Sequence, residues 1–281
     1  MPNRPTLLIT GCSSGIGLHA ASHFHQKGYR VIATCRQPKD VERLRQAGLE
    51  CFQMDLASDT SILSAIQDIQ KVTERIDLLF NNAAFGLPGA VEDLSREALR
   101  HQFETNVFGT QVLTNQILPI MRQQGHGKIV YNSSILGFAA MPYRGAYNAS
   151  KFALEGLADT LRLELKGTDI QVVLIEPGPI LSSFRANAYA QFKRWIRKEQ
   201  SAHRDNYNAM IERLETEGSS APFTLGPEAV TAVVEKILHS TRPGIRYRVT
   251  MPTILFAILK RLLPGRWLDA LLIKAGGDGK R

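Results

Sequence analysis

Cysteine is scarce in this chain of 281 residues, and its spacing excludes two classes of protein. The three cysteines, Cys12, Cys35 and Cys51, are odd in number and form no CxxC pair. Such a set suits neither a disulfide framework nor a thiolate metal site. We expect all three to be reduced and mostly packed in the interior.

Long apolar runs are also missing. The longest uncharged apolar stretch near the end, residues 249–259, has 11 residues and contains Pro252, whereas a membrane-spanning helix needs about 20 apolar residues. Residues 1–5 lead directly into a strand-like run, without the apolar region and cleavage site of a secretory signal. These absences predict a cytoplasmic protein without a membrane span.

Flexible linkers and low-complexity segments are absent from the middle of the sequence. Hydrophobic residues make up 44% of the chain and charged residues 21%, which is the balance of a globular protein and excludes disorder as the main state. We therefore expect one domain.

Positive charge is in excess, but it is confined to two segments. The net charge is +8, and residues 185–204 and 242–281 carry more than all of it, so the remaining body is slightly acidic. A nucleic-acid binder would present a broader basic face. The distribution therefore predicts two local basic surfaces and no nucleic-acid partner.

Short apolar runs alternate with helical patterns over the first 180 residues, which is typical of a parallel sheet covered on both faces. The predicted strands are 6–10, 30–34, 49–53, 77–80, 128–132 and 170–175, with 247–250 as a candidate seventh. The predicted helices are 16–27, 38–47, 59–74, 95–123, 146–166 and 227–240. The fold class is α/β, a doubly wound Rossmann-type sheet in one domain over residues 1–250. Residues 181–220 are expected to cover the substrate, and residues 251–281 form a basic, apolar tail.

A glycine-rich segment follows the first strand directly and leads into a helix. Glycines at such a turn let the backbone approach a pyrophosphate, whose charge is met by the N–H groups of the helix start. The candidate phosphate-binding residues are Gly11, Ser13, Ser14, Gly15, Ile16 and Gly17. The sequence therefore predicts a dinucleotide site.

The ends of the next strands extend this prediction. The second strand ends at Arg36, where a site for NAD usually has an acidic residue, and a guanidinium suits the 2′-phosphate of NADP. Asp55 and Leu56 follow the third strand and are placed to meet the adenine. Asn82 and Ala83 follow the fourth, where small residues let the backbone pass close to the cofactor. We predict NADP rather than NAD.

A candidate reacting centre lies after the fifth strand. Ser134 follows the strand, and Tyr147 and Lys151 stand four residues apart on one face of the next predicted helix. A nearby ammonium favours the phenolate and lowers the pKa of a phenol from about 10. Such a tyrosine exchanges a proton with a carbonyl oxygen while hydride moves to or from carbon.

These motifs together resemble the short-chain dehydrogenase/reductase family. TGxxxGIG at 10–17, NNAA at 81–84, Ser134, YNASK at 147–151 and PGPI at 177–180 stand in the family's order over about residues 5–250. Within the family the chain is similar to 17β-hydroxysteroid dehydrogenases, retinol dehydrogenases and bacterial NADP-dependent aldehyde reductases. In two places it departs from the family pattern, with Ala84 where glycine is common and Ser182-Ser183 where a threonine is usual.

The resemblance implies a role for each matched residue. Tyr147 is the catalytic acid/base, Lys151 lowers its pKa and holds the nicotinamide ribose, and Ser134 orients the substrate carbonyl. Asn106 matches the asparagine that holds a proton-relay water. The remaining implied cofactor contacts are Asn82 beside the ribose, Pro177 and Gly178 along the nicotinamide, and Ile180 and Ser182 after them.

The expected function is NADPH-dependent reduction of a lipophilic aldehyde or ketone, or the reverse oxidation of an alcohol. One alternative is an NAD-dependent dehydrogenase of a polar alcohol. Another is a cofactor-sensing protein without turnover. By resemblance, the helices that carry Asn106 and Tyr147 are subunit faces, so we expect a homo-oligomer.

Three further features have two interpretations each. His19, His23 and His25 are interpreted as ordinary helix residues rather than metal ligands, so no metal is expected. Aromatic and apolar residues of the cover either line an apolar substrate pocket, which we favour, or pack the cover down; they are Phe184, Tyr189, Phe192, Trp195, Ile196 and Tyr207. The tail either lies peripherally at a membrane surface or packs on the body or a neighbouring subunit.

Overall fold

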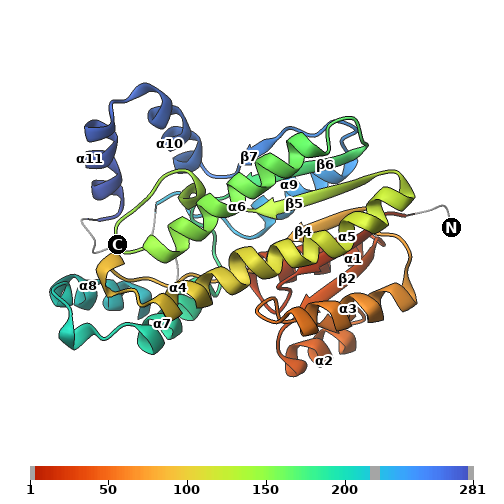
Figure 1. Cartoon of the computed structure of the whole chain (residues 1–281), viewed down its shortest axis with the longest axis horizontal. Helices are drawn as coiled ribbons and strands as arrows, with labels where there is room; N and C mark the ends of the chain where they lie inside the picture. Colours follow the sequence, from red (N-terminus) through yellow and green to blue (C-terminus); the bar gives the residue numbers. More distant parts are fainter. Residues whose placement is uncertain (1–3, 216–221, 278–281) are drawn as a thin grey trace.

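A computed structural model describes residues 4–215 and 222–277 of the chain. Its centre is a seven-stranded sheet of order β3-β2-β1-β4-β5-β6-β7, and every neighbouring pair is parallel (Figure 1). The strands are β1 (Thr6–Thr10), β2 (Arg30–Cys35), β3 (Glu50–Gln53), β4 (Leu78–Asn81), β5 (Gly127–Asn132), β6 (Ile170–Glu176) and β7 (Arg246–Arg248). The doubly wound Rossmann-type sheet and its seventh strand are confirmed.

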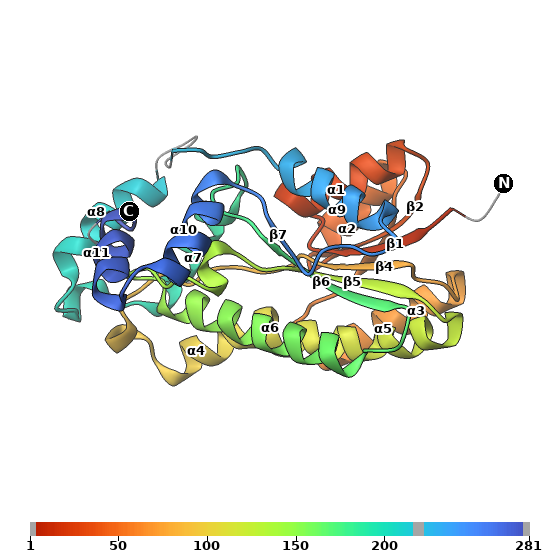
Figure 2. The same cartoon turned by 90° about the horizontal axis from the view of Figure 1, so that it is seen from above.

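The sheet is buried on both faces because successive strand residues point to opposite sides. Leu7 and Ile9 of β1 join a core cluster with helices α1, α2 and α9, whereas Leu8 joins a second cluster with α3, α5 and α6. Figure 2 shows the two helix layers on either side of the sheet. The bounds of these helices are α1 (Gly15–Gln26), α2 (Pro38–Gln46), α3 (Asp59–Val72), α5 (Thr110–Gln124), α6 (Gly145–Glu164) and α9 (Glu228–His239).

The helix predicted over 95–123 is interrupted. It consists of α4 (Arg96–Phe103), a π-helical turn η2 (Glu104–Gly109) and α5. Two tertiary contacts fix the turn: Asn106 binds the backbone of Phe85, and a Cβ on Gly109 would lie 1.7 Å from the carbonyl oxygen of Leu56. Single π-helical turns inside α-helices often occur at functional sites, and this one contains a predicted site residue.

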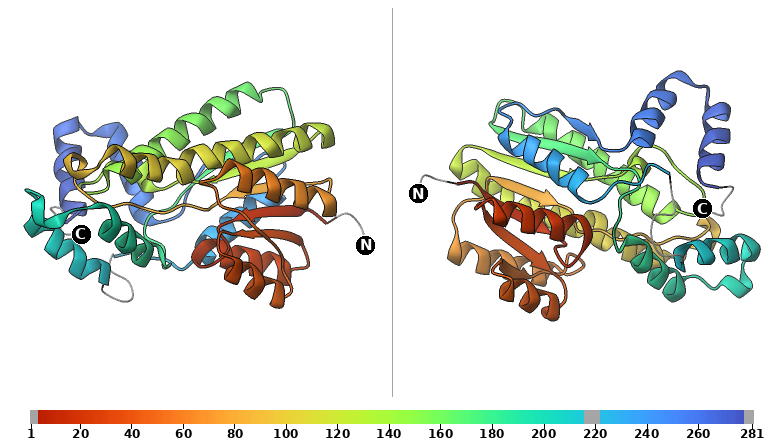
Figure 3. Two further views of the ribbon diagram at one scale, coloured as in Figure 1. Left: turned by 60° about the horizontal axis from the view of Figure 1, so that its bottom comes forward. Right: turned by 180° about the vertical axis from the view of Figure 1, so that it is seen from behind.

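Two segments after β6, residues 184–215 and 251–277, gather beyond the carboxyl ends of the strands, as both views of Figure 3 show. The predicted cover contains α7 (Phe184–Trp195), the 3₁₀ turn η4 (Lys198–Gln200) and α8 (Arg204–Glu215), and the tail forms α10 (Met251–Leu262) and α11 (Gly265–Ala275). The last cover residues, 216–220, and the tail residues 278–281 lie outside the described part of the chain.

Lys128 of β5 ties the sheet to the end of α9. Its ammonium donates hydrogen bonds to the carbonyl oxygens of Ile237, Leu238 and Ser240 at 2.9, 2.6 and 2.7 Å. The last carbonyls of a helix have no partner within the helix and carry partial negative charge, so a partly buried cation there is stabilising.

Replacing this lysine is expected to destabilise the fold. Lys128→Met removes all three charge-assisted hydrogen bonds, so we expect the free energy of unfolding to fall by about 2 kcal/mol or more. Lys71→Met, which removes an exposed ion pair to Asp68, is expected to change it by less than about 0.5 kcal/mol. Equilibrium denaturation measures both, and equal losses would contradict the role of Lys128.

Candidate active site

The sheet changes winding direction between β1 and β4, and the predicted cofactor residues meet there. In doubly wound folds the crevice at this point, outside the carboxyl ends of the strands, binds the ligand. The Thr10 hydroxyl accepts hydrogen bonds from the backbone N–H groups of Asn82 and Ala83 at 2.9 Å each. The Asn82 side chain donates to the carbonyl oxygen of Thr10 at 2.8 Å. The segments after β1 and β4 are thus held side by side.

The glycines of the segment after β1 (residues 11–17, called the glycine segment) have no room for a side chain. Gly11 has φ +70°, and a Cβ there would lie 2.8 Å from the Cα of Ala83. A Cβ on Gly17 would lie 2.3 Å from the carbonyl oxygen of Gly11. Ser14 precedes α1 with no side-chain hydrogen bond to the helix start, and the first turn has no acidic residue. The N–H groups of that turn therefore suit the pyrophosphate of a dinucleotide.

One arginine contacts this segment, and another follows the neighbouring strand. Arg36 follows β2 and is exposed. Arg43 of α2 donates to the carbonyl oxygen of Ser13 at 2.7 Å and also pairs with Asp40. Sequence analysis missed Arg43, because nothing in its own helix shows that the side chain reaches the glycine segment.

The predicted adenine side is formed after β3. The backbone N–H of Asp55 donates to the Ser61 hydroxyl, and its carboxylate accepts from the N–H of Ala57 at 3.0 Å. Leu56 is buried against the η2 turn through Gly109. Both residues therefore have fixed backbones at the same edge of the sheet as the glycine segment.

The segment after β6 lies on the opposite side of the crevice. The carbonyl oxygen of Pro177 accepts from the N–H of Ile135, next to Ser134, at 2.8 Å. A Cβ on Gly15 would lie 3.0 Å from the Cβ of Ser182, so this segment approaches the glycine segment. Two further predicted cofactor residues lie between Pro177 and Ser182 in the sequence. Ile180 forms a β-bridge with Leu225, and Gly178 packs against Thr250, the residue before α10.

Ser134 and Tyr147 are in contact beneath the cover. Tyr147 is buried on α6, and its ring meets that of Phe184 edge-on at 5.2 Å between centroids. Burial raises the pKa of the phenol above its ordinary value, and a hydrogen bond with Ser134 only partly offsets this. The lowering expected from Lys151 is not found in the chain alone, where desolvation of the phenolate sets the direction of the shift.

Lys151 is buried one turn further along α6. Its Nζ donates to the carbonyl oxygen of Asn132 at 2.6 Å and lies 5.7 Å from the centroid of the Tyr147 ring. Burial lowers the pKa of this lysine to about 8, and the nearby Glu155 carboxylate acts in the opposite direction. Asn132 also donates to the side chain of Asn82 at 2.9 Å, while its own Oδ1 is buried with no hydrogen-bond partner.

Glu155 is a supporting residue that sequence analysis missed. Its carboxylate accepts from the Ser133 hydroxyl at 2.7 Å and from Arg246 at 3.3 Å. It stands one helical turn beyond Lys151 on the same face of α6. The four-residue spacing from Lys151 could therefore have predicted its position beside the lysine. A carboxylate at this position favours the charged form of the lysine.

Asn106 lies next to this group without touching Lys151. Its Oδ1 accepts from the N–H of Phe85 at 3.1 Å, and its Nδ2 donates to the Phe85 carbonyl oxygen and to the Ser150 hydroxyl. These contacts connect the segment after β4 to α6 immediately before Lys151. In this structure Asn106 therefore holds the Phe85 backbone and the Ser150 hydroxyl in place.

Apolar residues from four segments surround Tyr147. Its cluster contains Ile135, Leu136 and Ala139 after β5, together with Phe256 of α10 and Leu272 of α11, and it is lined further by Phe138, Met141, Phe184 and Leu268. The tail therefore packs against the cluster that holds the predicted catalytic tyrosine.

Most of the six cover residues pack the cover down, and three of them, Tyr189, Phe192 and Ile196, also line a pocket of the cover that lies apart from the predicted catalytic residues. Phe192, Ile196 and Tyr207 are buried in a separate cluster with Leu87 and Ala146, where they pack the cover down. The Tyr207 hydroxyl accepts from the N–H of Ala90 at 2.8 Å and donates to Asp93. Tyr189 and Trp195 border the same cluster. Of the six residues, Phe184 is the one that meets Tyr147, because it lies in the first turn of α7, where the cover leaves the crevice.

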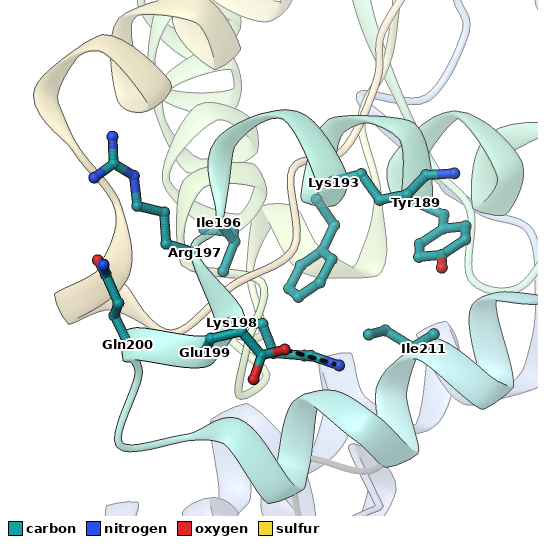
Figure 4. Close-up of a pocket in the computed structure, with 9 residues that line it drawn as sticks. Tyr189, Lys193, Ile196, Arg197, Lys198, Glu199, Gln200 and Ile211 are labelled. Carbon is teal, nitrogen blue, oxygen red and sulfur yellow. Dashed lines mark ion pairs between the residues drawn. The ribbon is translucent and has the colours of Figure 1, made fainter.

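A cavity of about 450 Å³ lies inside the cover (Figure 4). Phe192, Ile196 and Ile211 form its apolar part, and charged side chains of α7 and η4 line its rim, with Lys198 and Glu199 paired at 3.6 Å. None of the predicted catalytic residues lines it.

The three histidines of α1 do not form a common site. His19 hydrogen-bonds to Thr231 at 2.8 Å, His23 pairs with Glu235 at 3.1 Å, and His25 is exposed. Within residues 4–215 and 222–277, no group of three His, Cys, Asp or Glu side chains is close enough to hold a metal ion. In the same ranges, no helix has the length and apolar character to cross a membrane.

Comparison with known proteins identifies the family. The short chain dehydrogenase family model matches residues 5–193. This chain belongs to the short-chain dehydrogenase family. It is 42% identical to the uncharacterized oxidoreductase YbbO of Escherichia coli K12, over 95% of this chain and 93% of that protein. It is 35% identical to human retinol dehydrogenase 8, over 86% of this chain and 80% of that protein.

Solved structures confirm the fold. A short-chain dehydrogenase/reductase from Burkholderia phymatum, determined with NAD, has a TM-score of 0.75 at 24% identity, covering 91% of this chain and 92% of that one. A variant of actinorhodin polyketide ketoreductase with NADPH has a TM-score of 0.71 at 25% identity, covering 88% and 95%. The chain is therefore an oxidoreductase of a family that uses nicotinamide cofactors.

The lowered pKa of Lys151 predicts a pH-dependent stability. Above about pH 8 the folded chain releases a proton that the unfolded chain keeps up to its ordinary pKa of 10.5. The free energy of unfolding therefore rises with pH in this window. Relative to Lys151→Met, wild type is expected to gain about 1 to 2 kcal/mol between about pH 7.5 and pH 9.5.

Denaturation curves at several pH values test this. Comparison with the variant cancels the titration of the buried tyrosines and cysteines. Lys39→Met, at an exposed position of α2, is the control, and its curve should run parallel to that of wild type. A constant difference between wild type and Lys151→Met would show that Lys151 keeps its ordinary pKa.

Proposed function

We propose that the protein is an NADPH-dependent reductase of lipophilic aldehydes or ketones. The observation that carries the proposal is a buried, neutral Tyr147 that contacts Ser134, lies one turn from Lys151 and faces apolar side chains. Under the same proposal, the glycine segment, the segments after β3 and β4, and residues 177–182 hold the cofactor.

The residues of the chain supply the proton and the orientation. When bound, the nicotinamide supplies the hydride for a carbonyl carbon. The Ser134 hydroxyl positions the carbonyl oxygen, and the Tyr147 hydroxyl gives that oxygen its proton. Lys151, one turn away, stabilises the phenolate that remains, and Glu155 favours the protonated form of this lysine.

In the chain alone Tyr147 is protonated, which is the form that reduction requires. A phenol with a raised pKa keeps its proton near neutral pH, which is the form that donates to a carbonyl oxygen. Oxidation would require the phenolate, whose desolvation burial disfavours. Protonated Lys151 beside it reduces this cost once the proton has left.

The substrate class follows from the surroundings of Tyr147. The cluster around it consists of aliphatic, aromatic and methionine side chains from α7, α10, α11 and the segment after β5. Ligand sites are mostly apolar with a few orienting polar groups. A polar alcohol, as in the alternative function, would leave its hydroxyls without partners on this wall.

Exposed apolar side chains support an oligomer. Phe108 of η2 is 49% exposed and Leu163 of α6 is 63% exposed, on the helices that the family resemblance assigns to subunit faces. Phe152 and Leu157 of α6 are also exposed. We propose that a second copy of the chain covers them. The cytoplasmic location stays a prediction.

Removing the Tyr147 hydroxyl tests the reaction. Tyr147→Phe is expected to lower kcat for NADPH-dependent reduction of lipophilic aldehydes by about 10² to 10⁴-fold, because the general acid is lost. Consumption of NADPH, followed by its absorbance, measures the rate.

Tyr29→Phe is the matched control. It removes a hydroxyl that contacts His239, away from the crevice, and should leave the rate unchanged. Equal rates for wild type and Tyr147→Phe would exclude the proposed acid. Cofactor binding without turnover of any carbonyl would favour the cofactor-sensing alternative.

Charge reversal at Arg36 tests the cofactor. Arg36→Asp is expected to raise KM for NADPH relative to NADH by about 10-fold or more, since a guanidinium–phosphate contact is replaced by repulsion. Arg122→Asp, an exposed reversal on α5, serves as control and should leave the ratio unchanged. An equal rise in both KM values for Arg36→Asp would contradict the preference for NADP.

A further inference from the structure

The tail helix α10 has two apolar faces, and only one of them is covered by the described part of the chain. Thr253, Phe256 and Ala257 are buried against the body. Five large apolar side chains lie on the other side and are between 47% and 73% exposed: Met251, Ile254, Leu255, Ile258 and Leu262. They stand at positions i, i+3, i+4, i+7 and i+11, which places all five in one stripe along the helix.

The next helix, which contacts α10, also carries exposed apolar side chains. In α11, Leu272 packs on the body, whereas Trp267 is 66% exposed and Leu271 and Ile273 are also exposed. Figure 1 shows α10 and α11 side by side, projecting from the end of the molecule that holds the site. Exposed apolar surface of this kind usually marks an interaction site.

The charges around the two helices indicate the partner. Arg261, Arg266 and Lys274 are exposed, and none forms an ion pair with another residue of 4–215 or 222–277. Asp269 is the one carboxylate in residues 251–277. A second copy docking face to face would bring these cations together, whereas anionic headgroups would neutralise them. An apolar face with basic flanks is the pattern of helices that lie in the membrane interface.

The same helices are anchored to the site. Lys260 of α10 donates to the carbonyl oxygen of Phe138 at 2.5 Å, and Phe256 and Leu272 share the cluster of Tyr147. The pair therefore stands between the apolar wall of the site on one side and the exposed stripe on the other. The helices that would meet a bilayer therefore also border the predicted catalytic tyrosine.

We propose that the exposed face of α10 and α11 docks on the surface of an anionic lipid bilayer and that lipophilic substrate reaches Tyr147 from the membrane beside these helices. The docking itself stands on the surface described, whereas the route of the substrate rests on the proposed function.

Vesicle binding tests the docking without nucleotide or substrate. Wild type should float with vesicles of phosphatidylcholine and phosphatidylglycerol, and bind vesicles of phosphatidylcholine alone more weakly. Ile258→Ser/Leu262→Ser is expected to weaken binding to the anionic vesicles by about 10-fold or more. Leu63→Ser/Val72→Ser, which removes two exposed apolar side chains of α3, is the matched control and should bind as wild type does.

The charge variant tests the choice of lipid and leaves the apolar stripe intact. Arg261→Gln/Arg266→Gln should bind anionic vesicles about 10-fold more weakly, with less dependence on salt. Failure of wild type to bind anionic vesicles, or unchanged binding by Ile258→Ser/Leu262→Ser, would overturn the proposal. It would also be overturned if sedimentation velocity showed that Ile258→Ser/Leu262→Ser dissociates an oligomer, since the stripe would then be a subunit interface.

Turnover separates this proposal from the proposed function. With NADPH, Ile258→Ser/Leu262→Ser should reduce a short water-soluble aldehyde at the wild-type rate but a long-chain aldehyde held in anionic vesicles with kcat/KM about 10-fold lower. Equal loss on both aldehydes would overturn the membrane route. Vesicle binding by a protein that reduces no carbonyl would disprove the proposed function and leave the docking in place.

Discussion

The burial of one ammonium group governs the arrangement of this site. Lys151 is buried on α6, where an uncompensated charge is costly. Its ammonium donates to the carbonyl oxygen of Asn132, and the negative charge of the Glu155 carboxylate favours its charged form. Asn132 reaches that position because β5 ends there, and Glu155 because it lies one helical turn away. The phenol of Tyr147 is buried in an apolar cluster nearby, and this burial raises its pKa, so the phenol keeps its proton.

The parallel sheet makes this arrangement possible. Every strand ends at the same edge, so short segments from β1, β4, β5 and β6 meet without long connections. Hydrogen bonds between their ends, joining Thr10 to Asn82 and Asn82 to Asn132, run across the edge as one network. The segments are therefore fixed relative to one another before any ligand contacts them.

Most of the fold was predictable from local patterns. Short apolar runs located the first six strands, and the candidate seventh strand at 247–250 overlaps β7. The glycine segment after β1 predicted a dinucleotide site at the point where the sheet changes winding direction. The interruption of the helix at Glu104–Gly109 was not predictable, because it arises from contacts with Phe85 and Leu56 that are distant in sequence. The burial of Phe192 and Tyr207 was missed for a similar reason: an aromatic residue that packs a cover down has the same sequence signature as one that lines a pocket. The direction of the pKa shift at Tyr147 depended on its burial, which spacing to Lys151 does not reveal.

The turn at Gly178 joins the crevice to the tail. A Cβ at Gly178 would lie 2.1 Å from the hydroxyl of Thr250, the residue that precedes α10. The backbone expected to touch the nicotinamide is thus in van der Waals contact with the start of the tail. Any side chain at position 178 would collide with Thr250, so this turn and the start of α10 are packed as one unit, and a change in the position of the tail would require the turn to move with it.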